Sequence, residues 1–400
     1  MNIIKHFKGI RFNSDMVKIE NCIAPPYDVF NYGDDTDSKL RSNPYNIVHI
    51  QKPEGEGDSK YENAASVLKN FIDNGTLIED AKEGIYILEQ SWGGSSRTGI
   101  LAVVKLDETY DKIRPHEKTK KGPITDRFKL TKSTGLNIGS IFVVFNDTDS
   151  TVSGMITDEK SSGGTLLYDC VFPGSIRNRL FFSENTDILS MIEEKHLYIA
   201  DGHHRYQTML DFRNFCRNSA ASSAGEDTFE YTLMFIVPDS EITILPYHRL
   251  IKDLDPAITG ALPEKVRSLF SVDKHAGIPK APPKGSIGMF LCDTYYVLTP
   301  KENNAALDVE LLHNSILEPF LGLDEDKIKS GDYIHYFSGD TDIEEIFKPV
   351  REGKYQLGFA LNPPEFSDIT GVSDKGLTMP RKSTFFYPKV PSGIAMYKAR

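Results

Sequence analysis

The sequence has few cysteines, no excess of positive charge and no long run of apolar residues. The four cysteines are Cys22, Cys170, Cys216 and Cys292, and their wide spacing argues against a cysteine-rich zinc site. Scattered, unpaired cysteines favour reduced thiols in a cytosolic protein. No apolar stretch approaches the roughly 20 residues that a membrane-spanning helix needs, and the N-terminal residues lack the apolar core of a signal peptide. We therefore expect a cytoplasmic protein that has no membrane partner.

The shortage of basic residues also limits the choice of partner. Lysine and arginine number 46 against 57 acidic residues, so the formal net charge is -11 at pH 7. A protein that binds nucleic acid chiefly through phosphate contacts needs positive charge to displace condensed counterions. The composition thus disfavours nucleic acid as a partner and is typical of a globular protein, with 39% hydrophobic and 26% charged residues.

The length of 400 residues exceeds what one hydrophobic core usually supports, so we expect several lobes. Helix-like and strand-like segments are mixed without strict alternation, which favours an α+β or mixed α/β fold. We predict an N-terminal α/β lobe over residues 1–150, a core over residues 165–275 and a C-terminal α/β lobe over residues 285–400. The glycine- and serine-containing stretch Ser150–Gly164 is interpreted as a connection between lobes.

The segment with the clearest chemistry is Asp201–Arg205, which reads Asp-Gly-His-His-Arg. It follows residues 195–200, which end in the apolar run Leu197–Ala200 and are typical of a buried strand, and apolar residues at helical spacing begin after it. At a strand-to-helix junction, backbone N–H groups and the helix dipole favour an anion. Arg205 adds a planar set of donors suited to phosphate or carboxylate. The pattern predicts a phosphate-binding turn, and a plain Asp-Gly turn is the alternative.

A second polar cluster spans Arg114–Thr119. Within it, His116 and Glu117 form an acid/base pair beside basic residues. Glu117 is a candidate to accept a proton from a substrate hydroxyl or to bind Mg²⁺ through its oxygens. The alternative is a solvated charged turn, because adjacent polar residues are common in loops.

A third cluster, Lys382-Ser383-Thr384, resembles the end of a P-loop, but the glycines that a Walker sequence requires before it are absent. A lysine and two hydroxyls beside an aromatic segment are still suited to clamp a phosphate. An ordinary edge strand whose charges deter pairing is the alternative.

Two proline-tyrosine turns, at residues 25–28 and 43–46, are the last candidates. They offer Tyr27, Asp28 and Asn46 to a small substrate. Asn-Pro and Pro-Pro also form turns in their own right, so a purely structural role stays open.

With these clusters in view, the chain resembles the bacterial and archaeal domain-of-unknown-function family 1015 over nearly its whole length. The matching segments, in order, are Phe7–Phe12, Ala24–Val29, Asn43–His49, Tyr86–Gln90, Pro115–Thr119, Ile199–Tyr206, Met379–Pro380 and Lys382–Lys389. So many ordered matches make the resemblance to the family specific.

The turn at Asp201–Arg205 is also similar to the phosphate-binding motif of the ParB/sulfiredoxin-like superfamily, which includes partition-type CTPases, sulfiredoxin and kinases that phosphorylate free serine. The resemblance implies a ParB/sulfiredoxin-like nucleotide-binding core, elaborated with additional mixed-sheet lobes. It implies that Asp201 orients the turn or binds Mg²⁺, and that nucleotide phosphates are contacted by Gly202, His203, His204 and Arg205. Sulfiredoxin chemistry needs a cysteine in this turn, and its absence disfavours redox repair.

Together these features predict a nucleotide-dependent phosphotransferase that acts on a small hydroxylated metabolite, with free L-serine as the best guess. The expected cofactors are ATP, ADP or CTP together with Mg²⁺, and a homo-oligomer stays open. The assigned residues are Glu117, His116 and Asp201 for catalysis; Gly202, His203, His204, Arg205, Lys382, Ser383 and Thr384 for phosphate; Tyr27, Asp28 and Asn46 for substrate; and Asp201 and Glu117 for Mg²⁺.

Two other functions remain alternatives. The first is a nucleotide-gated regulatory or binding protein, a switch resembling partition CTPases, without kinase activity. The second is a metal-dependent hydrolase built on His116, Glu117, His203 and His204. The first should bind nucleotide without needing a second substrate, and the second should carry a transition metal.

Overall fold

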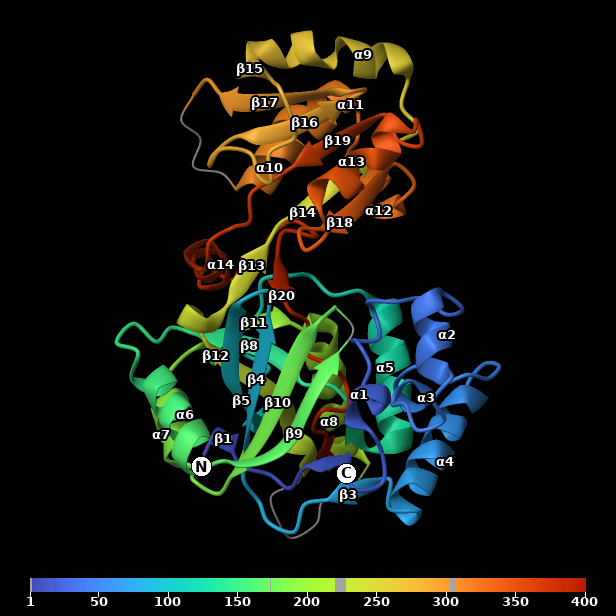
Figure 1. Ribbon diagram of the computed structural model, residues 1–400, viewed down its shortest axis with the longest axis vertical. Helices are drawn as coiled ribbons and strands as arrows, with labels where there is room; N and C mark the ends of the chain where they lie inside the picture. Colours follow the sequence, from blue (N-terminus) through green and yellow to red (C-terminus); the bar gives the residue numbers. More distant parts are fainter. Residues whose placement is uncertain (1, 173, 220–227, 303–306) are drawn as a thin grey trace. The chain divides into compact units, whose positions relative to one another are not determined.

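The protein has a mixed α/β fold, as the sequence predicted (Figure 1). The computed structural model describes residues 2–172, 174–219, 228–302 and 307–400. The chain forms two compact units: unit 1 comprises residues 1–242 and 388–400, and unit 2 comprises residues 243–387. Unit 2 is therefore an insertion in the sequence of unit 1. No helix among the described residues is both long and apolar enough to cross a membrane.

Unit 1 is built on a nine-stranded mixed sheet. The β11–β6 and β12–β8 pairs are parallel, and the other pairs are antiparallel. Strand β1 (Ile4–Lys5) pairs with β5, and the order of the other eight is β6 (Ile113–Arg114), β11 (Leu197–Asp201), β8 (Ile141–Phe145), β12 (Tyr231–Pro238), β5 (Ser95–Lys105), β4 (Ile85–Trp92), β10 (Ile176–Ser183) and β9 (Thr165–Phe172).

The centre of this sheet is covered on both faces. Strands β8 and β12 are almost wholly apolar and are buried at every position, which is the pattern of strands packed on two sides. Figure 1 shows α6 and α7 at one side of the sheet and α2 to α5 at the other. The helices of unit 1 are α1 (Ile19–Cys22), α2 (Asp35–Arg41), α3 (Val48–Gln51), α4 (Ser59–Asp73), α5 (Lys121–Thr134), α6 (Thr151–Ser162), α7 (Asp187–Glu193) and α8 (His203–Asn218).

The structure divides the chain differently from the three predicted lobes. The stretch Ser150–Gly164 is not an open connection, because most of it forms α6, in which Val152 and Ile156 are buried. Its serines and glycine suggested a loop, but two apolar residues four positions apart are enough to anchor one face of a helix. Strand β8, which precedes this stretch, pairs directly with β12, which comes later in the chain, and β9, which follows the stretch at once, belongs to the same sheet. Residues 1–150 and 165–242 thus belong to the same unit.

Unit 2 contains a six-stranded antiparallel sheet. Neighbouring residues such as Leu250 and Ile251, or Met289 and Phe290, belong to two different buried clusters, because successive side chains point to opposite faces of a strand. The strand order is β15 (Phe270–His275), β17 (Thr294–Pro300), β16 (Ile287–Leu291), β19 (Leu357–Ala360), β14 (Tyr247–Ile251) and β18 (Ile334–Ser338).

Helices of unit 2 cover the two clusters. One cluster includes apolar residues of α9 (Pro256–Lys265), α10 (Asp308–Leu312) and α11 (Glu318–Leu321). The other includes the apolar stripe of α13 (Ile343–Arg351), whose buried residues recur at helical spacing. Further elements are α12 (Glu325–Ser330), α14 (Phe366–Ser373) and the antiparallel pair β13 (Thr243–Leu245) and β20 (Phe385–Tyr387), with which unit 2 begins and ends.

The last residues of the chain complete unit 1. The backbone N–H of Ser392 donates to the oxygen of Ala24 at 2.8 Å, and that of Met396 donates to the oxygen of Ile10 at 2.9 Å. Strand β21 (Tyr397–Lys398) pairs with β7 (Leu136–Asn137). The segment from Pro388 onward is thus anchored to unit 1 along its length, which places Lys389 in that unit.

Candidate functional site

The predicted turn lies where β11 ends and α8 begins. Gly202 is the N-cap residue of α8 and has φ +97°, a left-handed conformation that side chains other than hydrogen rarely adopt. A Cβ at this position would lie 3.0 Å from Nε of Arg205. Glycine therefore permits both the turn and the close approach of the Arg205 side chain, and it leaves the first turn of α8 without a capping side chain.

Asp201 is held by two cations. The Nζ atom of Lys389 donates to one carboxylate oxygen, and Nη2 of Arg205 donates to the other. Burial alone would raise the pKa of Asp201, but Lys389 and Arg205 outweigh it and hold the pKa well below its usual value. Two cations around one carboxylate leave a net positive charge beside the N-terminus of α8, where the helix dipole adds to it.

The two histidines of the turn hold the loop that carries Glu117. The backbone N–H of His116 donates to Nε2 of His203 at 3.3 Å, and that of Lys120 donates to Nε2 of His204 at 2.9 Å. The rings of His116 and His203 meet edge to face, with centroids 4.7 Å apart. An imidazole nitrogen that accepts from the backbone cannot donate to a phosphate at the same time. In this arrangement the histidines position residues 116–120.

Burial keeps the inner histidines neutral. It lowers the pKa of His116 to about 4 and that of His203 well below its usual value, and the positive charge of Lys389 lowers both further. His116 was predicted as a catalytic group. As a buried, neutral ring packed on His203, it is placed to support the neighbouring Glu117.

Glu117 lines a cavity of about 390 Å³ on one face of α8. Its Oε2 atom lies 4.0 Å from Nδ1 of His203, and its side chain is 34% exposed. The cavity is also lined by Tyr110, Pro115, Lys118, Thr119, Ile199, His203, Tyr206 and Gln207. A partly exposed carboxylate in a cleft next to a positively charged turn suits a general base.

A second, smaller cavity of about 60 Å³ lies beside Arg205. Its residues from α8 are Arg205, Thr208 and Met209, whereas the larger cavity is lined by His203, Tyr206 and Gln207. At about 100° per residue these two sets lie on opposite faces of the helix. Tyr27 also lines the small cavity, and burial raises the pKa of its hydroxyl to about 12, so that the hydroxyl stays a neutral donor.

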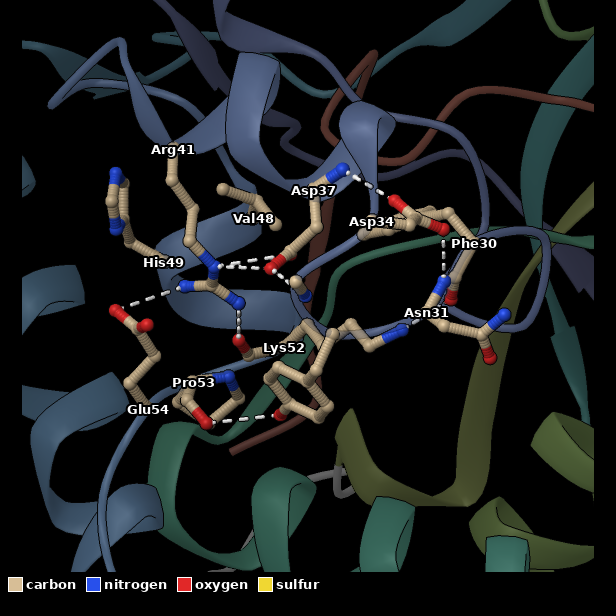
Figure 2. A network of polar contacts seen from close by, with 12 residues as sticks. Phe30, Asn31, Asp34, Asp37, Arg41, Val48, His49, Lys52, Pro53 and Glu54 are labelled. Carbon is tan, nitrogen blue, oxygen red and sulfur yellow. Dashed lines mark hydrogen bonds and ion pairs between the residues drawn. The ribbon is translucent and has the colours of Figure 1, made fainter.

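A network of charged residues around Asp37, Arg41 and Lys52, drawn in Figure 2, lies next to the turn that carries Tyr27. Nζ of Lys52 donates to the backbone oxygen of Tyr27 at 3.3 Å and to that of Phe30. Figure 2 shows Arg41 directed at Asp37, with Nε to Oδ2 at 2.9 Å. Arg41 also donates to the oxygen of Lys52 at 2.7 Å, so the network ties α2 to the end of α3.

The other predicted substrate residues lie apart from the cavities. Asp28 is exposed. Asn46 is 1% exposed, and its Nδ2 donates to the oxygens of Asn21 at 2.7 Å and Ile23 at 3.1 Å. Its Oδ1 accepts from Val48 at 2.9 Å. The side-chain amide of Asn46 is therefore hydrogen-bonded to the backbone of neighbouring segments, as expected if this turn has a structural role.

Lys382, Ser383 and Thr384 belong to unit 2. Within that unit Nζ of Lys382 lies 4.7 Å from the centroid of the Tyr247 ring, and Oγ of Ser383 donates to the oxygen of Pro380 at 2.6 Å. Ser383 also lines a cavity of about 490 Å³ together with Tyr247 and Arg249. Their role in phosphate binding stays a prediction.

Asp201 does not fit the role of a metal ligand, because both of its oxygens already accept from cations. Among the described residues, no group of three or more histidine, cysteine, aspartate or glutamate side chains is arranged to hold a metal ion. The imidazoles of His203 and His204 accept from the backbone. The Nε2 atoms that a metal-dependent hydrolase would use as ligands are thus already engaged with the backbone in this arrangement.

Sequence reasoning missed Lys389. It lies seven residues beyond Lys382, which was selected for its neighbouring hydroxyls, and it is 188 positions from its partner Asp201. The available signal was a basic residue at the end of the last family-like segment.

The chain was compared with known families and structures. The family described as "Protein of unknown function (DUF1015)" matches residues 4–317. No curated protein matches the chain. Among similar solved structures is a conserved hypothetical protein from Pyrococcus furiosus, with 13% sequence identity and a TM-score of 0.38, and the match covers 75% of this chain and 95% of that chain. A free serine kinase in complex with AMP has 12% identity and a TM-score of 0.36, and the match covers 72% of this chain and 86% of that chain. SbnI with C-terminal truncation from Staphylococcus aureus has 13% identity and a TM-score of 0.37, and the match covers 73% of this chain and 85% of that chain. Such low TM-scores support no inference about the site.

Proposed function

The chain belongs to the DUF1015 family, and from its own geometry we propose that it is a nucleotide-dependent phosphotransferase acting on a small hydroxylated metabolite. The donor we propose is ATP, ADP or CTP, and the first acceptor to test is free L-serine. The ligands would be a nucleotide and a small molecule.

One observation carries this proposal: a positively charged turn lies next to a cavity that contains a carboxylate. Asp201 is outnumbered by Lys389 and Arg205, and the N-terminus of α8 adds its dipole, so the turn suits a multiply charged anion. The cavity of about 390 Å³ beside it contains Glu117 and is large enough for a small acceptor together with part of a nucleotide.

The chemistry asks little of the protein beyond placement and charge neutralisation. The bond between the terminal phosphorus and the bridging oxygen of the nucleotide breaks, and a bond forms between that phosphorus and the acceptor oxygen. Glu117 takes the proton of the acceptor hydroxyl. The backbone N–H groups at the N-terminus of α8, where His203 lines the Glu117 cavity, would stabilise the charge on the transferred phosphoryl group, and Arg205 on the opposite face of α8 adds positive charge to the turn.

A coupled assay with Glu117→Gln tests the proposal. Glutamine keeps the size of the side chain but cannot accept the proton, so turnover with serine should fall by about 10²- to 10⁴-fold while nucleotide affinity changes little. Glu184→Gln is the control, because Glu184 is 60% exposed and pairs with Lys82. It should leave turnover unchanged.

Two results would count against the proposal. Unchanged turnover in Glu117→Gln would remove Glu117 as the base. Nucleotide binding by the wild type with no product from any hydroxylated acceptor would favour the nucleotide-gated switch, which should instead change oligomeric state on binding. A thermal-shift series of nucleotides with and without Mg²⁺, followed by amino acids, separates these cases, because ligands of the native state raise its apparent stability.

A further inference from the structure

Lys389 is brought to the turn by a cluster of buried polar residues. Gln90, Arg97 and Asn178 are polar or charged, yet each is 0% exposed. They lie on neighbouring strands in the interior of the nine-stranded sheet. Nη2 of Arg97 donates to the backbone oxygen of Pro388 and to Oε1 of Gln90. Nε2 of Gln90 donates to Asn178 at 2.9 Å and to the backbone oxygen of Lys389 at 3.4 Å.

Such a cluster is costly to build. A buried guanidinium loses its hydration, and burial lowers the pKa of Arg97 to about 9. Phe142 and Phe235 lie against it, with ring centroids 4.5 and 5.4 Å from the guanidinium carbon. The backbone groups that this cluster fixes are those of Pro388 and Lys389. Its result is therefore the placement of the Lys389 side chain at Asp201.

Resting on the proposed function, we infer that Lys389 is a phosphate-binding residue of the site, held beside Asp201 until the phosphate of a nucleotide binds. In the absence of a nucleotide, Asp201 is the counter-ion of Lys389 and keeps its ammonium group at the turn. Lys389 is 19% exposed in its side chain, so its ammonium lies at the border between the interior and the solvent.

Arg205 and Lys389 differ in their freedom to follow a ligand. The guanidinium of Arg205 is fixed on two sides, by Asp201 and by the backbone oxygen of Ser140, and a Cβ at Gly139 would lie 3.4 Å from its Nη1. Lysine presents a compact charge on a flexible four-carbon chain, so it can turn from a carboxylate to a phosphate without moving the backbone. Lys389 is thus the mobile cation of the pair.

A buried hydroxyl next to Arg205 also points to a ligand. Ser140 is 3% exposed, and its Oγ has no hydrogen-bond partner among the described residues. Buried polar atoms usually have a partner, because leaving one unpaired costs free energy. Ser140 directly precedes β8, which pairs with β11 beside the turn. A phosphate oxygen bound by Lys389 and Arg205 would give this hydroxyl an acceptor.

The experiment compares Lys389→Met with Lys160→Met in the full chain. Lys160 is a matched control: its Nζ donates to buried Glu89 in the same unit, and its side chain is 18% exposed. Affinities for ATP and for inorganic pyrophosphate would be measured by calorimetry, and stability by urea unfolding. Lys389→Met should weaken both ligands by about ten- to one-hundredfold, the effect of one charge-assisted hydrogen bond, and Lys389→Arg should recover most of the loss. Lys160→Met should leave both affinities unchanged.

Pyrophosphate separates this inference from the proposed function. If the wild type binds pyrophosphate and Lys389→Met does not, the phosphate-binding role stands even when no acceptor is phosphorylated. If Lys389→Met binds both ligands as the wild type does, Lys389 only stabilises the fold. Failure of the wild type to bind either ligand would also overturn the inference.

Discussion

In the described part of unit 1, two carboxylates on strands of the nine-stranded sheet are each held by one lysine and one arginine. Glu89 on β4 accepts from Lys160 and from Arg179, and Asp201 at the end of β11 accepts from Lys389 and Arg205. Each triad combines one carboxylate, one lysine and one arginine, so the net charge of the two triads is the same. Their surroundings differ, and the surroundings decide which triad is suited to bind a ligand.

The Glu89 triad lies on the regular part of the sheet. Arg179 faces Glu89 across the antiparallel pair of β10 and β4, and it is 36% exposed, so water screens its charge. The Asp201 triad lies at a glycine turn before a helix N-terminus, with cavities on two faces of that helix. Its cations are 16% and 19% exposed. An ion triad is therefore suited to bind a ligand when backbone N–H donors and a cavity lie beside it, as they do at Asp201.

The largest expected effect comes from removing each carboxylate. Asp201→Asn leaves Arg205 and Lys389 mostly buried without a counter-ion, so the free energy of unfolding should fall by about 3–5 kcal/mol. Glu89→Gln should cost about 1–2 kcal/mol, because the exposed Arg179 can be hydrated instead. Urea unfolding measures both. Pyrophosphate should restore stability to Asp201→Asn alone; equal losses and equal rescue would remove the distinction between the triads.

The pH dependence near the Asp201 triad should be the next largest effect. The pKa of His116 is lowered to about 4 in the folded chain, against about 6.5 when unfolded, so the unfolded state binds the proton first as the pH falls. Stability contributed by the neutral ring is therefore present above pH 6.5 and is lost as the pH falls towards 4. Between pH 7 and pH 5 the loss should be about 2 kcal/mol.

Urea unfolding of His116→Gln at the two pH values checks this expectation. The variant should lose about 2 kcal/mol less than the wild type over that interval, because glutamine does not titrate. Hydrogen exchange should also show residues 197–206 opening more at pH 5, while residues 85–92 around Glu89 change little. An identical pH dependence in wild type and variant would show that His116 is not buried in its neutral form.

Two glycines with similar backbones provide a smaller contrast. Gly202 has φ +97° and Gly94, in the turn between β4 and β5, has φ +86°. Alanine at either position should cost about 1–2 kcal/mol through left-handed strain. A Cβ at Gly202 meets Nε of Arg205 at 3.0 Å, whereas nothing lies within 4 Å of one at Gly94. Calorimetry should find weaker pyrophosphate binding only in Gly202→Ala, and a similar loss in Gly94→Ala would contradict the assignment of the turn.

The smallest effect is expected for Arg179→Met. This cation is partly exposed, and Glu89 keeps Lys160 as a partner, so the free energy of unfolding should change by less than about 1 kcal/mol. Nucleotide affinity should not change. A measurable loss of nucleotide affinity would mean that the Glu89 triad affects ligand binding at the Asp201 turn.

The strand-turn-helix at the site was predictable from local patterns. The apolar run before Asp201, the glycine and the helical spacing after it are all contained in about twenty residues, and β11 and α8 are found there. Where local pattern and packing disagreed, the prediction was wrong: Ser150–Gly164 looks like a connection, but tertiary contacts stabilise α6.

The partners of the turn were less predictable, because they depend on contacts between distant parts of the chain. Asp201 and Arg205 are four residues apart and were grouped at once, but Lys389 is 188 residues from Asp201. Arg97 lies in a serine- and threonine-containing hairpin that has no apolar pattern around it, yet it is fully buried. The histidines were expected to contact nucleotide phosphates, and nothing in the sequence indicated that their Nε2 atoms accept from the backbone of residues 116–120.

The insertion of unit 2 has a consequence for the order in which the site can form during synthesis. A ribosome adds residues from the N-terminus, so β11, the turn and α8 are all made before unit 2, and Lys389 is added only after unit 2 is complete. Until then Asp201 has Arg205 but lacks its lysine. A nascent chain can therefore form the nine-stranded sheet while it still lacks a cation of the site, and it acquires that cation only after the whole of unit 2 has been synthesised.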